Sequence, residues 1–281
     1  MKSNQLNEKQ LLLVIDAGNS NITFGIFDGE EIVHQWRIQT SKEKTSDEYG
    51  IELEQILHHF EYDSTMIKDV IIGSVVPDLM HALPAMCRRF LKKEALIVGE
   101  NTKTGVAIQM ENPKEVGADR ILNAVAGFEK YGGPLIIVDI GTAITHDVIS
   151  RQGIYLGGSI APGIGISSAA LFTRTSKLPR VELVAPKTAI GKNTVEAIQV
   201  GIVYGFIGLI DNILDHIVEE LIATGQGRPR IIATGGFSTL VAKNSRNIER
   251  IDKDITLHGL RIVYERTMEH RRKKELAHVA H

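Results

Sequence analysis

Several features that mark specialised classes of protein are scarce in this chain of 281 residues. Its one cysteine, Cys87, excludes an intramolecular disulfide and any metal site built from several cysteines. Because Cys87 lies in an apolar stretch with helical spacing, we predict a buried thiol. The formal net charge is only −2, so bulk charge favours neither a nucleic acid nor a membrane surface as a partner. The ten histidines show no spacing typical of zinc ligands, and no zinc site is predicted.

Long uninterrupted apolar runs are also missing. The longest apolar tract, residues 195–210, contains Glu196 and Gln199 and is stopped by Asp211, so we predict a helix buried inside the protein rather than a membrane span. The first ten residues are polar and lead directly into a strand, which is not the pattern of a signal peptide. We therefore expect a cytoplasmic protein. Residues 270–281 are polar and charged and predict a solvated, mobile end.

What remains is an ordinary globular composition, 43% hydrophobic and 23% charged, organised around residues 11–29. An apolar run ends at Asp16, a polar turn follows, and alternating residues lead to Asp28-Gly29, which predicts a strand, a tight turn and a second strand. Gly18 would let a phosphate approach the backbone, and Asp16 offers a carboxylate for a metal or its water. Hydrogen-bond donors come from Asn19, Ser20, Asn21 and Thr23. The alternative is that Asp16 and Gly18 merely form a turn.

The same pattern returns in the second half of the chain. An apolar strand ends at Asp139, Gly141 follows, and two more strands come after it. We interpret this as an internal duplication that gives two α/β halves, 1–130 and 131–281, each with a mixed sheet flanked by helices. Ligands in such folds bind where strands end, so Asp16 and Asp139 would enter one nucleotide cleft and suit a Mg²⁺-nucleotide. The turn at residues 234–236 is either a further nucleotide contact or a plain glycine-rich turn.

Seven segments extend this pattern and resemble, in the same order, the type III pantothenate kinases of the actin-like ATPase and sugar kinase superfamily. They cover residues 11 to about 267. The resemblance implies two duplicated ribonuclease H-like halves with the nucleotide cleft between them. The segments are Asp16-Ala-Gly-Asn-Ser-Asn21, Glu111-Asn-Pro-Lys-Glu-Val-Gly-Ala-Asp-Arg120, Val138-Asp-Ile-Gly-Thr-Ala143, Gly157-Gly-Ser-Ile-Ala-Pro-Gly163, Ser176-Lys-Leu-Pro-Arg180, Gly191-Lys-Asn-Thr194 and Ala233-Thr-Gly-Gly236.

The resemblance also implies an activity. The family phosphorylates pantothenate with ATP and Mg²⁺ to give 4'-phosphopantothenate, the first committed step towards coenzyme A, and its members form homodimers with the substrate site near the subunit interface. Two alternatives stay open: a non-catalytic accessory or regulatory protein on the same fold, and a kinase for another small alcohol. The retained Asp16, Asp119, Arg120 and Asp139 argue against the first, because a binding-only protein does not need a base.

The family's functional residues carry over to matching positions. By resemblance, Asp119 is the catalytic base and Asp139 holds a monovalent cation, K⁺ or NH₄⁺. The ATP contacts would be Asp16, Ala17, Gly18, Asn19, Ser20, Asn21, Ile22, Thr23 and Thr142. The pantothenate contacts would be Met110, Gly117, Ala118, Asp119, Arg120 and Thr194.

Elementary chemistry agrees with most of these roles. A carboxylate such as Asp119 can accept a hydroxyl proton, and Arg120 can bind the carboxylate of pantothenate bidentately near a helix start. The alternative for Asp119 and Arg120 is an exposed ion pair. Thr194 could equally cap a helix, as could Asn193, and the duplicated turn would make Asp139 a Mg²⁺ ligand rather than a monovalent-cation ligand.

Three positions depart from the family pattern. Ser20 stands where the family commonly has Thr, which keeps the hydroxyl. Met110 stands where the family often has a Tyr that touches the substrate, so that substrate contact is in doubt and the kinase for another alcohol stays open. His146 lies in a stretch that varies in the family, and we interpret it as a strand residue rather than a ligand.

Overall fold

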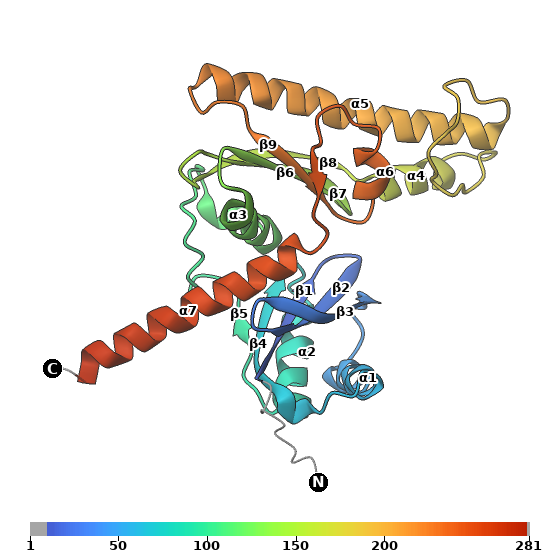
Figure 1. The fold of residues 1–281 in the computed structure, drawn as a ribbon. Coiled ribbons are helices and arrows are strands. Elements are labelled where there is room, and N and C mark those ends of the chain that lie inside the picture. Colours follow the sequence, from blue (N-terminus) through green and yellow to red (C-terminus); the bar gives the residue numbers. More distant parts are fainter. Residues whose placement is uncertain (1–9, 280–281) are drawn as a thin grey trace, which may run out of the picture. The chain divides into compact units, whose positions relative to one another are not determined.

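The computed structural model describes residues 10–279, which form two units (Figure 1). By contacts between residues, unit 1 comprises 1–105, 116–125 and 256–281, and unit 2 comprises 106–115 and 126–255. The chain therefore crosses between the units several times, and the last helix belongs with unit 1. The division into halves at residue 130 stays a prediction about the origin of the chain rather than a description of these units.

Unit 1 is built on a mixed five-stranded sheet in the order β3-β2-β1-β4-β5. The central strand β1 pairs antiparallel with β2 and parallel with β4. The strands are β1 (Leu11–Ala17), β2 (Asn21–Asp28), β3 (Glu31–Gln39), β4 (Ile67–Ser74) and β5 (Leu96–Ile97). They alternate with α1 (Ser46–His59), a 3₁₀ turn (Ser64–Met66), α2 (Leu79–Met86) and a π turn (Cys87–Leu91).

Unit 2 repeats this topology in a sheet ordered β10-β9-β6-β7-β8. Its central strand β6 again pairs antiparallel with the next strand and parallel with the one after the helices. The strands are β6 (Leu135–Ile140), β7 (Ala143–Ile149), β8 (Tyr155–Pro162), β9 (Arg230–Thr234) and β10 (Arg250–Ile251). The helices are α4 (Ile164–Thr173), α5 (Thr194–Ala223) and α6 (Ser238–Ala242). The predicted fold class, two duplicated α/β halves with mixed sheets, is confirmed.

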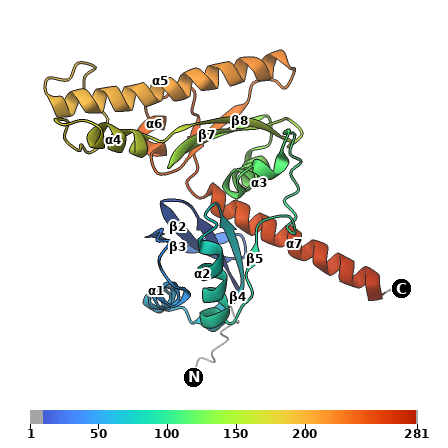
Figure 2. The same cartoon turned by 180° about the vertical axis from the view of Figure 1, so that it is seen from behind.

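Each sheet has its own core. In unit 1, α1 and α2 cover one face of the sheet and bury Tyr49, Leu53 and Leu83 among the alternate residues of β1. Cys87 belongs to this core, as predicted, and burial raises the pKa of its thiol to about 12. In unit 2, α5 lies along one face of the sheet in both views (Figures 1 and 2) and buries Val203, Ile210 and Leu214 against it.

Helix α5 extends beyond the apolar tract of residues 195–210. The local sequence of residues 194–223 predicts one helix, and the structure confirms these bounds. Asp211 is buried but accepts hydrogen bonds from Ser245 Oγ and from the backbone N–H of Arg246, so its carboxylate is satisfied. Within residues 10–279, α5 is the one helix long and apolar enough to cross a membrane by length and composition. One side of α5 packs into the core of unit 2, as expected of a buried helix, and a third of its most apolar stretch is buried.

The ends of three helices differ from prediction. Helix α7 (Ile255–Val279) extends through most of the segment predicted to be a mobile tail, which was wrong; residues 280 and 281 lie outside the described chain. The spacing of apolar residues predicts a helix over residues 114–131, but α3 (Ala118–Tyr131) begins four residues later because a separate 3₁₀ turn (Pro113–Glu115) precedes it. The sequence also predicts Ser46 as the cap of α1; the cap is instead Thr45, which forms a capping box with Glu48.

Candidate active site

The predicted phosphate turn lies in unit 1 between β1 and β2. The Gly18 N–H donates to the Asn21 carbonyl at 3.0 Å, which closes the turn. The side chains of Asn19, Ser20 and Asn21 are exposed on it, whereas those of Ala17 and Ile22 are fully buried. Ala17 and Ile22 can therefore meet a phosphate only through their backbones. The exposed amides and hydroxyl supply hydrogen-bond donors at the carboxyl end of the central strand.

Asp16 and Thr23 flank this turn as directly opposed residues of β1 and β2. Directly opposed residues of two strands share one face of the sheet, so the carboxylate and hydroxyl lie side by side. Both side chains are half-buried. On its other side, Asp16 is opposed by Gly73 of β4. The turn thus presents an acidic edge beside its donors.

Thr40 holds the turn from the far side, a role that the sequence did not reveal. Its hydroxyl donates to the Gly18 carbonyl at 2.6 Å, and its N–H donates to the Ser20 carbonyl at 3.1 Å. These two bonds fix both ends of the exposed stretch. Thr40 sits in a polar segment of ordinary composition, and no local pattern marks it as part of a site.

The predicted acceptor segment lies against the same strand ends. The Val75 N–H, just after β4, donates to the Ala17 carbonyl at 3.1 Å. A Cβ at Gly117 would lie 3.6 Å from Val75 Cγ1, and a Cβ at Gly73 would lie 2.8 Å from Leu122 Cδ1 of α3. The start of α3 therefore packs on the strand residue directly opposite Asp16. Unit 1 brings together the phosphate turn and the segment Gly117–Arg120.

Asp119 is the second residue of α3 and is half-buried. Its Oδ1 accepts from the Arg120 N–H at 2.8 Å. A Cβ at Gly117 would lie only 2.5 Å from that oxygen, so glycine lets the carboxylate fold back over the helix start. Backbone N–H groups in the first turn of a helix favour a bound anion.

In unit 2, Asp139 occupies the position in β6 that Asp16 occupies in β1. It is opposed by Thr145 of β7 and by Thr234 of β9. The glycine after β9 lies against Asp139. Gly235 has a φ of +89°, and a Cβ there would lie 2.4 Å from Asp139 Oδ1. Only glycine fits this position, so the backbone of the turn at Thr234–Gly236 lies directly against a carboxylate oxygen of Asp139.

Thr142 projects from the short turn after Asp139 and is exposed. This turn is closed by the Gly141 N–H, which donates to the Ala143 carbonyl at 3.0 Å, as the Gly18 N–H does in unit 1. A Cβ at Gly163 would lie 2.2 Å from the Thr142 carbonyl, so the start of α4 packs directly on the turn. Asp139, Thr142 and the Gly235 turn form one cluster.

Met110 lies at a different part of unit 2, beside β8. The backbone of residues 107–109 pairs with Tyr155 through N–H···O bonds of 2.8 Å in both directions. A Cβ at Gly157 would lie 4.0 Å from Met110 Cγ and Sδ. With 37% of its surface exposed, Met110 presents an apolar side chain where the family often has a tyrosine.

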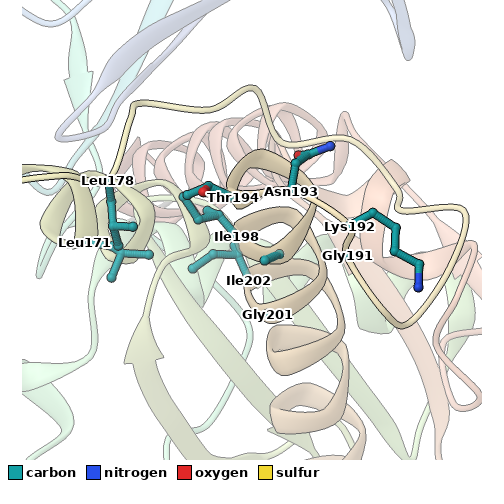
Figure 3. A pocket seen from close by; sticks show the side chains of 10 residues that line it. Leu171, Leu178, Gly191, Lys192, Asn193, Thr194, Ile198, Gly201 and Ile202 are labelled. Atoms are coloured by element: carbon teal, nitrogen blue, oxygen red, sulfur yellow. The ribbon is translucent and has the colours of Figure 1, made fainter.

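Thr194 begins α5 and lines an open pocket of about 570 Å³ (Figure 3). Asn193 is the helix cap: its Oδ1 accepts from the Glu196 N–H at 2.9 Å, so Thr194 is left uncommitted to capping. Figure 3 shows Leu171 and Leu178 facing the first turns of α5 across this pocket. The residues of the Asp139 cluster do not line it.

His146 is a buried residue of β7, as the interpretation of it as a strand residue expected. Its Nδ1 lies 2.8 Å from Ser159 Oγ on the neighbouring strand. On the other face of β7, Tyr155 Oη donates to Asp147 Oδ1 at 2.8 Å. Within residues 10–279, no group of three or more His, Cys, Asp or Glu side chains is placed to hold a metal ion.

Comparison with known proteins identifies the family. The family described as type III pantothenate kinase matches residues 12–216, most of the chain. The chain belongs to the type III pantothenate kinase family. A type III pantothenate kinase from Geotalea uraniireducens (strain Rf4) is 51% identical over 259 residues, which is 92% of this chain and 100% of that protein. The resemblance stated from the seven segments is confirmed.

Two solved structures agree with the fold of a type III pantothenate kinase. One is named as a Baf family transcriptional activator from Campylobacter jejuni; it is 21% identical, with a TM-score of 0.56 over 90% of this chain and 97% of that one. The other is the activator of the 2-hydroxyisocaproyl-CoA dehydratase from Clostridium difficile with bound ADPNP, 11% identical, with a TM-score of 0.51 over 95% and 97%. At these identities, the likeness concerns the fold alone.

Proposed function

We propose that this protein transfers the γ-phosphoryl group of ATP to the hydroxyl of pantothenate, giving 4'-phosphopantothenate and ADP in the first step of coenzyme A biosynthesis. One observation carries the proposal beyond family membership. In unit 1, the helix that bears Asp119 packs through Leu122 on Gly73, the strand partner of Asp16. This packing supports a role for Asp119 as the base for the acceptor hydroxyl, close to the turn proposed for the phosphates.

The reaction needs positioning, neutralisation of charge and a group that takes the hydroxyl proton. The pantothenate oxygen forms a bond to the γ-phosphorus, the bond from that phosphorus to the bridging oxygen breaks, and ADP leaves. The hydroxyl proton passes to the Asp119 carboxylate. Arg120 binds the pantothenate carboxylate, and the backbone of Gly117 and Ala118 completes the acceptor site.

The ATP side uses the turn from Asp16 to Thr23. Asn19, Ser20 and Asn21 donate to phosphate oxygens through side chains and backbone, and Thr40 keeps the turn in one conformation. Mg²⁺ bound to the phosphates supplies neutralising charge, and Asp16 is the carboxylate that suits its water-rich oxygen shell. By the family resemblance, Thr142 is a further ATP contact.

Asp139 holds the monovalent cation, K⁺ or NH₄⁺. Its environment fits a small cation, because the side chain offers oxygen and the Gly235 backbone closes around it where a Cβ would collide. The register places the Thr145 and Thr234 positions on either side. A Mg²⁺ role for Asp139 is the alternative left by its equivalence to Asp16.

Helix α5 favours a homodimer. One side of it packs into the core of unit 2, so lipid cannot surround it, yet the other side is apolar and exposed. On that side, among residues 10–279, no atom beyond the neighbouring residues and backbone of α5 itself lies within 4 Å of where a Cβ at Gly201, Gly205 or Gly208 would stand. Exposed Tyr204 lies beside them. Small residues let two helices approach closely, so we assign this face to a second copy, in a cytoplasmic protein without membrane or nucleic-acid partners.

The test is ATP consumption coupled to pantothenate, with Mg²⁺ and K⁺ present, in the full chain. We expect turnover with pantothenate and little with other small alcohols. Folded protein without turnover would favour an accessory or regulatory protein. Preference for another alcohol would identify a different kinase.

The variant Met110→Tyr tests whether position 110 sets the choice of substrate. With pantothenate as substrate, this variant should lower the pantothenate KM a few-fold, the gain of about one hydrogen bond.

A further inference from the structure

Helix α3 is held by the start of α7 within unit 1, close to Asp119. Thr256 Oγ1 donates to Asn123 Oδ1 at 2.7 Å, although the two residues are 133 positions apart in the chain. A Cβ at Gly259 would lie 2.3 Å from the Leu122 carbonyl oxygen. The two helices therefore lie backbone against backbone at this point, and one side-chain hydrogen bond fixes the position of one helix relative to the other.

Asn123 would destabilise the fold at this position if its side-chain amide had no hydrogen-bond partner. It is only 1% exposed, and a buried amide without a partner destabilises the fold by about 1–3 kcal/mol. It also stands four residues after Asp119, so the two side chains share one face of α3. The Asn123–Thr256 bond thus acts on the same helix face as the proposed base, one turn away.

The segment before α7 is fixed in unit 2 as well. Asp252, buried, accepts from Lys130 Nζ and Tyr131 Oη at 2.7 Å each. The Asp252 N–H donates to the Ala233 carbonyl at 2.8 Å, immediately before the Thr234–Gly236 turn. Residue 252 is therefore held within unit 2, and residues 256–259 are held against α3 within unit 1.

We propose that Asn123 and Thr256 are positioning residues that set where the Asp119 carboxylate stands relative to the acceptor hydroxyl. They act through the placement of α3 and do not touch ATP or pantothenate. This inference rests on the proposed function, in which Asp119 accepts the hydroxyl proton. Because a misplacement of about 1 Å can cost roughly 100-fold in rate, loss of the single bond should lower the chemical step and leave ATP binding intact.

The experiment compares Thr256→Val, which keeps the volume and removes the hydroxyl, with Thr256→Ser, which keeps the hydroxyl. In the full chain with ATP, pantothenate, Mg²⁺ and K⁺, kcat of Thr256→Val should fall roughly 10- to 100-fold with the KM for ATP within about twofold of wild type. Thr256→Ser should return kcat to within a few-fold of wild type. Asn123→Ala combined with Thr256→Val should be no slower than the slower single variant, because both remove one bond.

The possible outcomes distinguish failure of this inference from failure of the proposed function. An unchanged kcat in Thr256→Val, or a fall in melting temperature without a fall in kcat, overturns the inference and leaves the proposed function standing. A wild-type chain without turnover removes the proposed function and the inference with it. If Thr256→Val does not fold, Thr256→Ala removes the same hydroxyl without placing a second methyl group against the amide, and the same kcat criterion applies.

Discussion

At the scale of single residues, the site depends on side chains that hold backbone in place as well as on those that face the substrates. Thr40 is the clearest case, because it bonds to the carbonyls of Gly18 and Ser20 and lies outside the segments that resemble the family. A turn whose N–H groups bind phosphate works only while it keeps one conformation. If the turn binds ATP as proposed, Thr40 supports that site without touching ATP.

Thr40→Val should raise the KM for ATP several-fold, the cost of about one hydrogen bond, and leave the KM for pantothenate unchanged. Steady-state kinetics with each substrate varied in turn measures both values. Thr65→Val is the matched control, because Thr65 bonds only to Asp63 in an exposed turn. An unchanged KM for ATP in Thr40→Val would show that the turn keeps its conformation without the hydrogen bond from the Thr40 hydroxyl.

At the scale of elements, the connection between β10 and α7 is pinned to the end of α3 by Asp252. Burial opposes the charged form of Asp252, but hydrogen bonds from Lys130 and Tyr131 outweigh it and hold its pKa below the ordinary value of 3.8. A carboxyl whose pKa is lowered on folding stabilises the protein at pH values above its unfolded pKa. That contribution is lost as the pH falls through the folded pKa.

Asp252→Asn should therefore lower the free energy of unfolding by about 1–2 kcal/mol near neutral pH. The difference from wild type should stay constant down to about pH 4 and then vanish in stronger acid, where Asp252 itself is protonated. Denaturant unfolding at a series of pH values measures it. A difference that grows as the pH falls would contradict this assignment.

How much the sequence predicts depends on where the partners of a residue lie. The local sequence of residues 31–39 predicts a strand, and that of residues 194–223 predicts a helix. The structure has β3 (Glu31–Gln39) and α5 (Thr194–Ala223) with these bounds, because local patterns define them. The burial of Asp211 within α5 could not be predicted, because its hydrogen-bond partners, Ser245 and Arg246, come more than thirty residues later. The end of α7 was wrongly predicted to be mobile, because its charge was taken as a sign of mobility. Lys, Arg and Glu favour helix, however, and Glu269 pairs with Lys273.

The residues of the candidate site also differ in whether a local sequence pattern marks them. Asp16, Gly117–Arg120 and Asp139 were predicted from short motifs, and their roles stay predictions; within unit 1, the helix that follows Gly117 packs on Gly73, the strand partner of Asp16. Thr40 and the Asn123–Thr256 bond were not found, because single polar residues far apart in the chain carry no local signal. The close contact of Gly235 with Asp139 was likewise invisible before the register of β6 and β9 was known.

At the scale of the whole molecule, the exposed side of α5 predicts self-association. Sedimentation should show a dimer, and Gly205→Arg should shift it to monomer by placing a long charged side chain where two helices would meet. Gln55→Arg adds the same charge on the exposed side of α1 and should leave the dimer intact. A wild-type monomer, or a Gly205→Arg dimer, would remove α5 from the interface.

The central claim is that Asp119 takes the proton of the pantothenate hydroxyl. The most direct test is Asp119→Asn, which keeps the shape of the side chain and removes its basicity, measured in the coupled assay beside Asp78→Asn, an exposed aspartate paired with Lys42. The account predicts that kcat falls by roughly 100- to 10,000-fold in Asp119→Asn, with ATP binding within about twofold of wild type and Asp78→Asn unaffected. A rate near that of wild type in Asp119→Asn would contradict it.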